Sequence, residues 1–142
     1  MNDISYRRHL AKTITWRLVG TADTILLSWI ITGNPFVGIQ LGIAEVTTKS
    51  ILYYIHERIW YKINLTSKGV KLSSKKRHVL KTITWRVIGT LDTVLLAWFI
   101  SGSTVAALQI GTAEVVTKML LYYMHERVWY KINFGLANRK NR

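Results

Sequence analysis

Charged side chains stand inside two long apolar stretches of this chain, at equivalent places. The first stretch carries Arg17, Asp23, Glu45 and Lys49, and the second carries the same residue types in the same order as Arg86, Asp92, Glu114 and Lys118. Inserting one such charge at the centre of a bilayer costs about 2.5–3.5 kcal/mol, so ionisable groups there pair, meet water or line the path of an ion, a proton or a substrate. Ion binding is therefore one interpretation. The other is that the acids and bases only neutralise one another and set the helix register.

The spacing of these charges predicts which of them pair. Glu45 and Lys49 stand four residues apart with the acid first, which favours an ion pair within one helix. If the stretch folds back on itself, Asp23 lies near the depth of residue 44, and helical side chains lean toward their own N-terminus, so the ends of Asp23 and Lys49 converge. We expect one cluster of Asp23, Glu45 and Lys49, and a second of Asp92, Glu114 and Lys118. Arg17 is expected nearer the surface, reaching headgroups or Glu57.

Glycines flank the charges at helical spacing. Gly38 and Gly42 form a G-x-x-x-G pattern, which becomes Ala107 and Gly111 in the second stretch, and small residues at this spacing let membrane helices approach closely. The predicted packing positions are Gly20, Gly38, Gly42, Gly89 and Gly111. The charged faces are therefore expected to contact protein and not lipid.

Two further segments, "YYIHERIWYK" and "YYMHERVWYK", combine aromatic and charged residues. We interpret them as interfacial segments at the cytoplasmic surface, through His56, Glu57, Arg58, Trp60, His125, Glu126, Arg127 and Trp129. Together with His9 and His78 the histidines could form a metal site, but the H-E-x-x-H pattern is absent. We predict no metal, and there is no signature of another cofactor.

A shift of 69 positions aligns residues 9–65 with residues 78–134 without a gap, and 34 of the 57 aligned positions are identical. The chain is therefore an internal duplication. Each copy is near the lower size limit for a water-soluble core.

Each copy spans the membrane once or twice. A single span over residues 24–44 would contain the turn signal Gly33, Asn34 and Pro35, and would place the basic linker opposite both basic termini. Two spans joined by a tight turn avoid both problems. We predict helices over about residues 13–31, 36–58, 82–100 and 105–127.

The predicted fold class is thus all-α: an integral membrane protein with four transmembrane helices, arranged as two tandem hairpins in the same orientation. The first hairpin covers residues 1–66, a basic cytoplasmic linker residues 67–77, and the second hairpin with a basic tail residues 78–142. We expect the four helices to pack as a bundle about a pseudo-two-fold axis.

The formal net charge is +13, and the basic residues gather at the termini and the linker. The positive-inside rule then predicts a bacterial inner-membrane protein with both termini in the cytoplasm. The same rule accounts for the charge without nucleic acid. The N-terminus lacks the pattern of a cleaved signal peptide. No nucleophile with a base at motif spacing, no glycine-rich phosphate loop and no dinucleotide motif is present, so we predict no enzyme.

The pattern K-T-I-T-W-R-x-x-G-T-x-D-T, followed by E-V-x-T-K and Y-Y-x-H-E-R-x-W, resembles a family of predicted bacterial membrane proteins, the domain of unknown function DUF2061. The resemblance covers residues 9–63 and 78–132. It implies a membrane location and a hairpin unit, with no established activity. An association of some members with sulfate-activation proteins implies an anion-related role.

Two functions remain open. The first is permeation of a small ion, with Lys49, Lys118, Arg17 and Arg86 attracting an anion. The second is a non-catalytic structural or assembly subunit of a larger membrane complex. Four short helices enclose little volume, so the expected partners are the lipid bilayer and either further copies of the chain or a membrane complex.

Overall fold

The computed structural model describes residues 3–66 and 74–135. They form four helices, α1 (Asp3–Thr32), α2 (Pro35–Thr66), α3 (Ser74–Ser101) and α4 (Thr104–Lys131), and the described part contains no strand. The predicted all-α fold with two tandem hairpins is confirmed.

Both hairpin turns lie where the sequence predicts them. Gly33 (φ 71°) and Gly102 (φ 68°) adopt the left-handed conformation that ends a helix, and their amides donate to the carbonyls of Trp29 and Trp98. Pro35 then occupies the first position of α2, where its missing N–H costs nothing. The Ser103 hydroxyl caps α4 by accepting from the Ala106 amide at 3.2 Å.

The helices extend well beyond the predicted bounds at the ends away from the turns. α1 begins at Asp3 and not near residue 13, and α2 continues to Thr66. The prediction followed the apolar stretch, which marks only the part that fits a hydrocarbon core of about 30 Å. The 30 residues of α1 reach about 45 Å, so its polar N-terminal turns continue the helix past that core. α3 begins at Ser74, inside the segment predicted as linker, and residues 67–73 lie outside the described part.

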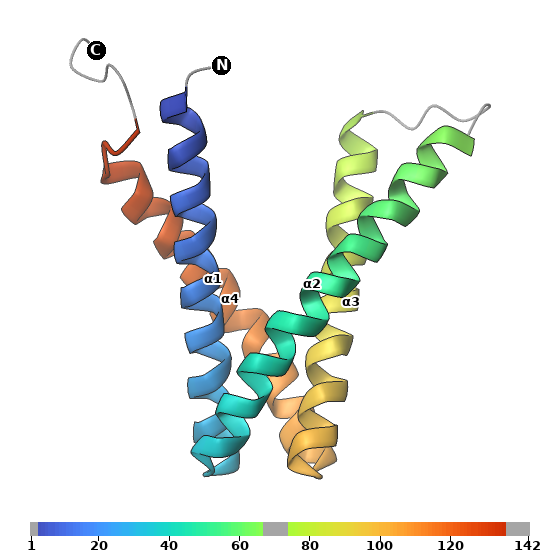
Figure 1. Cartoon of the computed structure of the whole chain (residues 1–142). Helices are drawn as coiled ribbons and strands as arrows, with labels where there is room; N and C mark the ends of the chain where they lie inside the picture. Colours follow the sequence, from blue (N-terminus) through green and yellow to red (C-terminus); the bar gives the residue numbers. More distant parts are fainter. Residues whose placement is uncertain (1–2, 67–73, 136–142) are drawn as a thin grey trace.

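The four helices form a V (Figure 1). Both turns lie at the narrow end, where α1 packs on α2 and α3 packs on α4. α2 and α4 then run diagonally, so that at the wide end α1 lies beside α4 and α2 beside α3. We call these two pairs the arms. Each hairpin is thus closed at its turn, and each arm combines one helix from each repeat.

This arrangement differs from the expected bundle, in which all four helices would stay together over their full length. The two repeats are still related by an approximate two-fold axis, as the matching contacts below show. The difference arises because α2 and α4 are inclined and leave their hairpin partners, since each gains a new partner from the other repeat.

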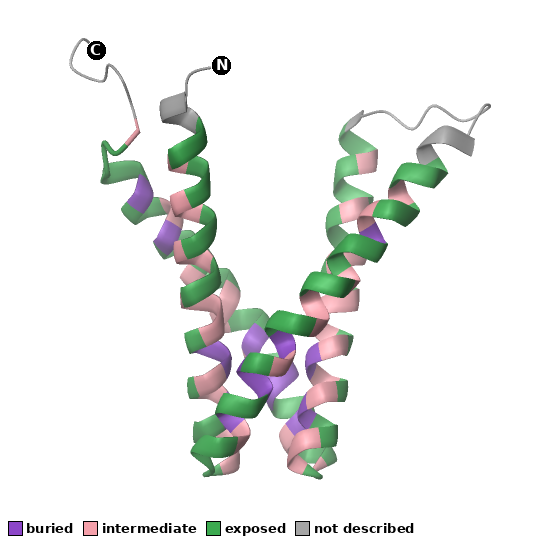
Figure 2. Ribbon diagram, in the orientation of Figure 1, coloured by how far each residue is buried: buried purple, intermediate pink, exposed green. Residues whose placement is uncertain are grey.

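Buried positions gather where the four helices meet (Figure 2). The apolar core there is small and consists of Leu41, Ala97, Ala107 and Ile110. Large apolar side chains cover the outside instead, with Phe99 86% and Ile30 76% exposed. An exterior of this kind fits lipid and not water.

Within the described residues, three helices are long and apolar enough to cross a membrane by length and composition, over Tyr6–Thr32, Lys75–Ser101 and Thr104–Lys131. α2 has 32 residues and is the repeat copy of α4, with its acidic and basic residues at the same positions. The four helices therefore make up one integral membrane unit.

Candidate functional site

Four side chains form the centre of the molecule, one from each helix: Thr24, Glu45, Thr93 and Glu114. The Thr24 hydroxyl lies 2.9 Å from Glu45 Oε2 and 2.5 Å from Glu114 Oε1. The Thr93 hydroxyl lies 2.8 Å from Glu114 Oε2 and also contacts Glu45. All four are buried, with 0–5% of their surface exposed. Each carboxylate thus lies within hydrogen-bond distance of one threonine from each repeat.

Lys49 and Lys118 neutralise this centre. Each lysine forms the predicted ion pair with the glutamate four residues before it, Lys49 with Glu45 and Lys118 with Glu114. Each also donates at 2.8 Å to a threonine of the other repeat, Lys49 to Thr93 and Lys118 to Thr24. The lysine side chains remain 27% and 28% exposed, so they border the edge of the buried centre.

The sequence predicted that Asp23 pairs with Lys49. In the structure, Asp23 instead contacts the opposite repeat. Its Oδ2 accepts from the Thr117 hydroxyl at 2.9 Å and lies 3.7 Å from Lys118 Nζ. Asp92 likewise accepts from Thr48 at 2.9 Å. The two predicted clusters, one per hairpin, are therefore wrong. A single cluster of both repeats replaces them, because α1 at this depth lies along α4.

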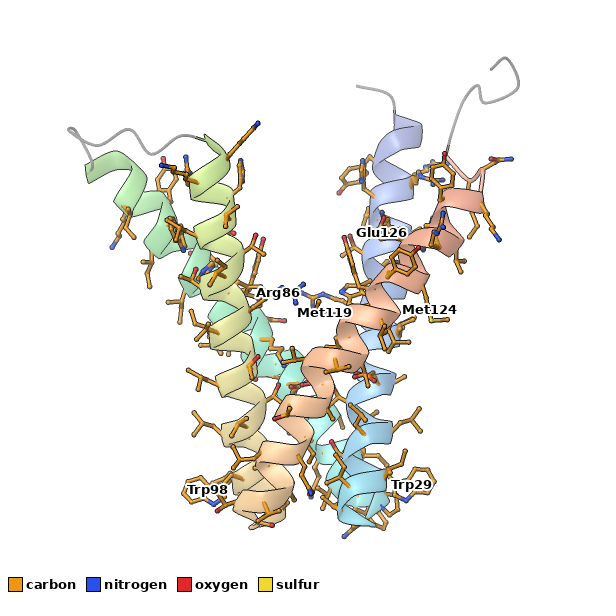
Figure 3. The ribbon with its side chains drawn as sticks, turned by 180° about the vertical axis from the view of Figure 1, so that it is seen from behind. Trp29, Arg86, Trp98, Met119, Met124 and Glu126 are labelled. Carbon is orange, nitrogen blue, oxygen red and sulfur yellow. The ribbon has the colours of Figure 1, made fainter. Side chains whose placement is uncertain are left out.

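Arg17 and Arg86 stand apart from these ion pairs. Arg17 donates to the Ser50 hydroxyl at 3.5 Å, and Glu57, its predicted partner, pairs instead with Lys81. Arg86 has no ion pair within the described residues. Its side chain is exposed and extends into the space between the arms (Figure 3), beside a shallow hollow lined by Arg86, Val87, Thr90 and Leu91.

A second set of polar contacts holds each arm together nearer its open end. Lys12 pairs with Glu126 at 2.6 Å in one arm, and Lys81 pairs with Glu57 at 2.6 Å in the other. The predicted interfacial segments therefore contact helices of the opposite repeat. Arg58 and Arg127 remain on the outside, each over the ring of the tyrosine four residues earlier.

The histidines of these segments are buried between aromatic rings. His56 lies 2.9 Å from the Thr84 hydroxyl, and its Nε2 accepts from the Trp60 indole at 3.1 Å. His125 makes the same contacts with Thr15 and Trp129. The Nδ1 atom has no hydrogen-bond partner among the described residues in either histidine. The histidines thus join helices through their side chains.

Three of the five predicted glycines permit close contacts between helices. A Cβ at Gly38 would lie 2.5 Å from the Ile25 carbonyl oxygen, and one at Gly42 would lie 2.7 Å from the Ile25 side chain; Gly111 meets Val94 in the same way. These three bring the helices of a hairpin together. Gly20 and Gly89, also predicted as packing positions, differ: a Cβ there would lie 3.8 Å from the stem of Lys118 or Lys49 of the other repeat, an ordinary van der Waals contact, so these two positions do not require glycine.

The residues that the sequence reasoning missed are threonines. Thr24, Thr93, Thr48, Thr117, Thr15 and Thr84 each bond a charged or aromatic partner across the repeats. Each is identical in the two copies, which was the available signal. The residue type alone indicates no site, because a threonine hydroxyl in a membrane helix usually bonds a carbonyl of its own helix.

The residues that the structure describes contain no group of three or more His, Cys, Asp or Glu side chains placed to hold a metal ion.

Comparison with known proteins agrees with the duplicated fold. A family model described as "Predicted membrane protein (DUF2061)" matches residues 10–61 and again residues 79–130. No curated protein and no solved structure matches the chain. The two matches cover more than half of the chain and coincide with the two hairpins, so the protein belongs to the DUF2061 family and contains its domain twice in tandem.

Proposed function

We propose that this protein is a multi-pass protein of the bacterial inner membrane, with both termini in the cytoplasm, that binds a small anion between its arms and lets it pass. It acts without catalysing a reaction. The observation that carries the proposal is the pair of arginines that lack a carboxylate partner. All the lysines that the sequence places at membrane depth are paired, whereas Arg86 has no partner among the described residues and Arg17 has only the Ser50 hydroxyl.

The depth of these arginines makes their charge significant. Arg17 stands 15 residues before the end of α1, so it lies about 22 Å from the turn along the helix axis, within a hydrocarbon core of about 30 Å. An unpaired guanidinium at that depth requires water or an anion. The basic ends of the helices lie at the wide end of the V, where their positive charge attracts anions.

Lys49 and Lys118 lie below the arginines toward the turns and are partly exposed. They offer a second positive region, although their ammonium groups are already engaged by the glutamates. Beyond them, Leu41 and Ile110 are fully buried and close the turn end. An anion that crosses must therefore displace these buried apolar side chains, so we expect the narrow end to open during transport.

Flux through reconstituted liposomes tests the proposal. Replacing Arg17→Gln and Arg86→Gln together should reduce chloride and sulfate flux to that of protein-free vesicles, because both unpaired charges are removed while the buried cluster remains. The matched control is Arg58→Gln with Arg127→Gln, which removes two arginines from the outer surface and should leave the flux unchanged.

Arginine at this position could also hold the phosphate of an anionic lipid. The liposomes are therefore prepared with and without anionic lipid. Flux that depends on Arg17 and Arg86 in both preparations supports a free anion as the ligand. Arginine-dependent retention of anionic lipid without any flux, or equal flux in the Gln variant, contradicts permeation.

A second function, a structural or assembly subunit, is supported by a different observation. The central cluster has a hydrogen-bond or ion-pair partner for every charged side chain, and such a network can serve only to hold helices together. In that case the protein should co-purify with a membrane complex that is lost on deletion of the gene. Intact membrane complexes in the deletion strain would contradict it.

A further inference from the structure

The surface that joins the two repeats is polar, specific and used twice. In one arm, α1 offers Lys12, Thr15 and Asp23 to Glu126, His125 and Thr117 of α4. In the other arm, the equivalent residues of α3 meet the equivalent residues of α2, through Lys81–Glu57, Thr84–His56 and Asp92–Thr48. The same contacts therefore occur on both sides of the pseudo-two-fold axis.

A single hairpin carries both halves of this surface. In the first repeat, α1 presents Lys12 while α2 presents Glu57, and neither contacts the other, because each belongs to a different arm. A surface whose two complementary halves lie on the same unit fits a second copy of that unit through a two-fold axis. The tandem chain has the geometry of such a dimer, with its two units joined by a linker.

The distribution of identical residues supports this independently. Both partners of every contact named above are identical in the two repeats. Exposed positions outside this surface often differ between the two repeats: Ile30 corresponds to Phe99, and Ile43 corresponds to Thr112. The first repeat can therefore supply every one of these contacts to another first repeat.

We infer that the partner of each hairpin can be a hairpin of a second copy of this chain, so that two chains exchange repeats and form a dimer. Each arm of that dimer combines helices from both chains through the contacts seen here within one chain. The linker favours pairing within the chain by raising the local concentration of the second repeat, so exchange grows with the density of the protein in the membrane. The inference does not depend on anion transport.

Charge reversal on the full chain tests the exchange. One variant, the acidic form, carries Lys12→Glu and Lys81→Glu; the other, the basic form, carries Glu57→Lys and Glu126→Lys. In either form alone, both arms bring like charges together, within the chain and between identical chains. When the acidic and basic forms meet, all four ion pairs are restored, but only between chains.

The two forms are co-expressed with different affinity tags, and the recovery of one tag with the other is measured in mild detergent. We expect the mixed pair to co-purify about tenfold more than two differently tagged copies of the same form, a difference that corresponds to ~1.4 kcal/mol. Their joint expression should also raise the membrane level of both forms above the level of either alone.

The control is one chain with all four reversals, in which the ion pairs are restored within the chain. It should accumulate like the wild-type protein and should not co-purify with either form. Exchange is refuted if the mixed pair co-purifies no better than identical copies while this control accumulates. It is equally refuted if the control is no more stable than the acidic form, because these pairs would then not join the repeats.

Discussion

Thr24 and Thr93 each have one hydroxyl hydrogen, yet each oxygen lies within hydrogen-bond distance of two carboxylates and one lysine. A hydroxyl can accept from a lysine and donate to one carboxylate at a time. Each threonine therefore accepts from a lysine of the other repeat and donates to either of the two glutamates, one of which belongs to each repeat. At the scale of single residues, this pair of hydroxyls connects the charges into one network.

Replacing Thr24→Val tests this role, because valine keeps the shape of the side chain and removes the hydroxyl. One of the two glutamates loses a hydrogen-bond donor and Lys118 loses an acceptor, so the free energy of unfolding should fall by about 1–3 kcal/mol, measured by denaturant titration in mixed micelles. Thr13→Val is the control, since that exposed hydroxyl bonds only the His9 carbonyl of its own helix. Equal effects of the two substitutions would show that the network does not stabilise the fold.

At the scale of the elements, each helix changes partner along its length. α1 packs on α2 at the turn end and beside α4 at the open end, while α3 packs on α4 and then beside α2. The glycines that meet Ile25 and Val94 maintain the hairpin contact, and the Lys12–Glu126 and Lys81–Glu57 pairs maintain the arms. The length of the helices allows both the hairpin contact and the arm contact, because a helix confined to the hydrocarbon core would end before the outer part of the arm.

Cross-linking tests which helices share an arm, and the chain contains no native cysteine to interfere. Thr15→Cys with His125→Cys should react efficiently with a short thiol-specific cross-linker, since those side chains lie 2.9 Å apart between α1 and α4. After a protease cuts the linker, cross-linked repeats stay together on a denaturing gel, whereas repeats that have not reacted separate into two fragments.

The control pair is Thr15→Cys with His56→Cys, which lie in the same repeat but in opposite arms. It should not cross-link within a chain. Efficient reaction of this pair inside one chain would mean that each hairpin stays closed over its whole length, against the observed arms.

At the scale of the whole molecule, polarity is arranged along the long axis. Basic residues such as Arg7, Arg8 and Lys12 lie at the open end of the V, and the two turns carry no charge. Trp29 and Trp98 lie at the turn end on the outer surface (Figure 3), where indole rings favour the membrane interface. This arrangement underlies the proposed orientation, with the open end in the cytoplasm.

Cysteine labelling in intact cells checks that orientation. Asn34→Cys and Ser103→Cys, one in each turn, should react with a membrane-impermeant maleimide from outside the inner membrane, because the turns are uncharged and face away from the basic ends. Arg58→Cys, exposed near the open end, should react only after the membrane is permeabilised. Labelling of Arg58→Cys before permeabilisation would invert the proposed topology.

Much of the fold is readable from the residues alone. The internal repeat, the Gly33 and Gly102 turns, the four spans and the Glu45–Lys49 ion pair depend on local spacing, composition and length, and the structure bears them out. The helices predicted from the apolar stretches are too short, because hydropathy identifies the part of a helix that prefers lipid and does not detect where its polar continuation ends.

The assignment of partners between the repeats was decided only by the tertiary structure. Asp23 could be placed at the depth of the other charges from its distance to the turn, but Lys49 and Lys118 are equivalent in depth and type, so sequence cannot choose between them. The inclination of α2 and α4 makes the choice, and it brings Asp23 to Lys118 and Thr117. Depth along a helix is a local property of the chain, whereas the direction that a helix takes depends on all the surfaces that it meets.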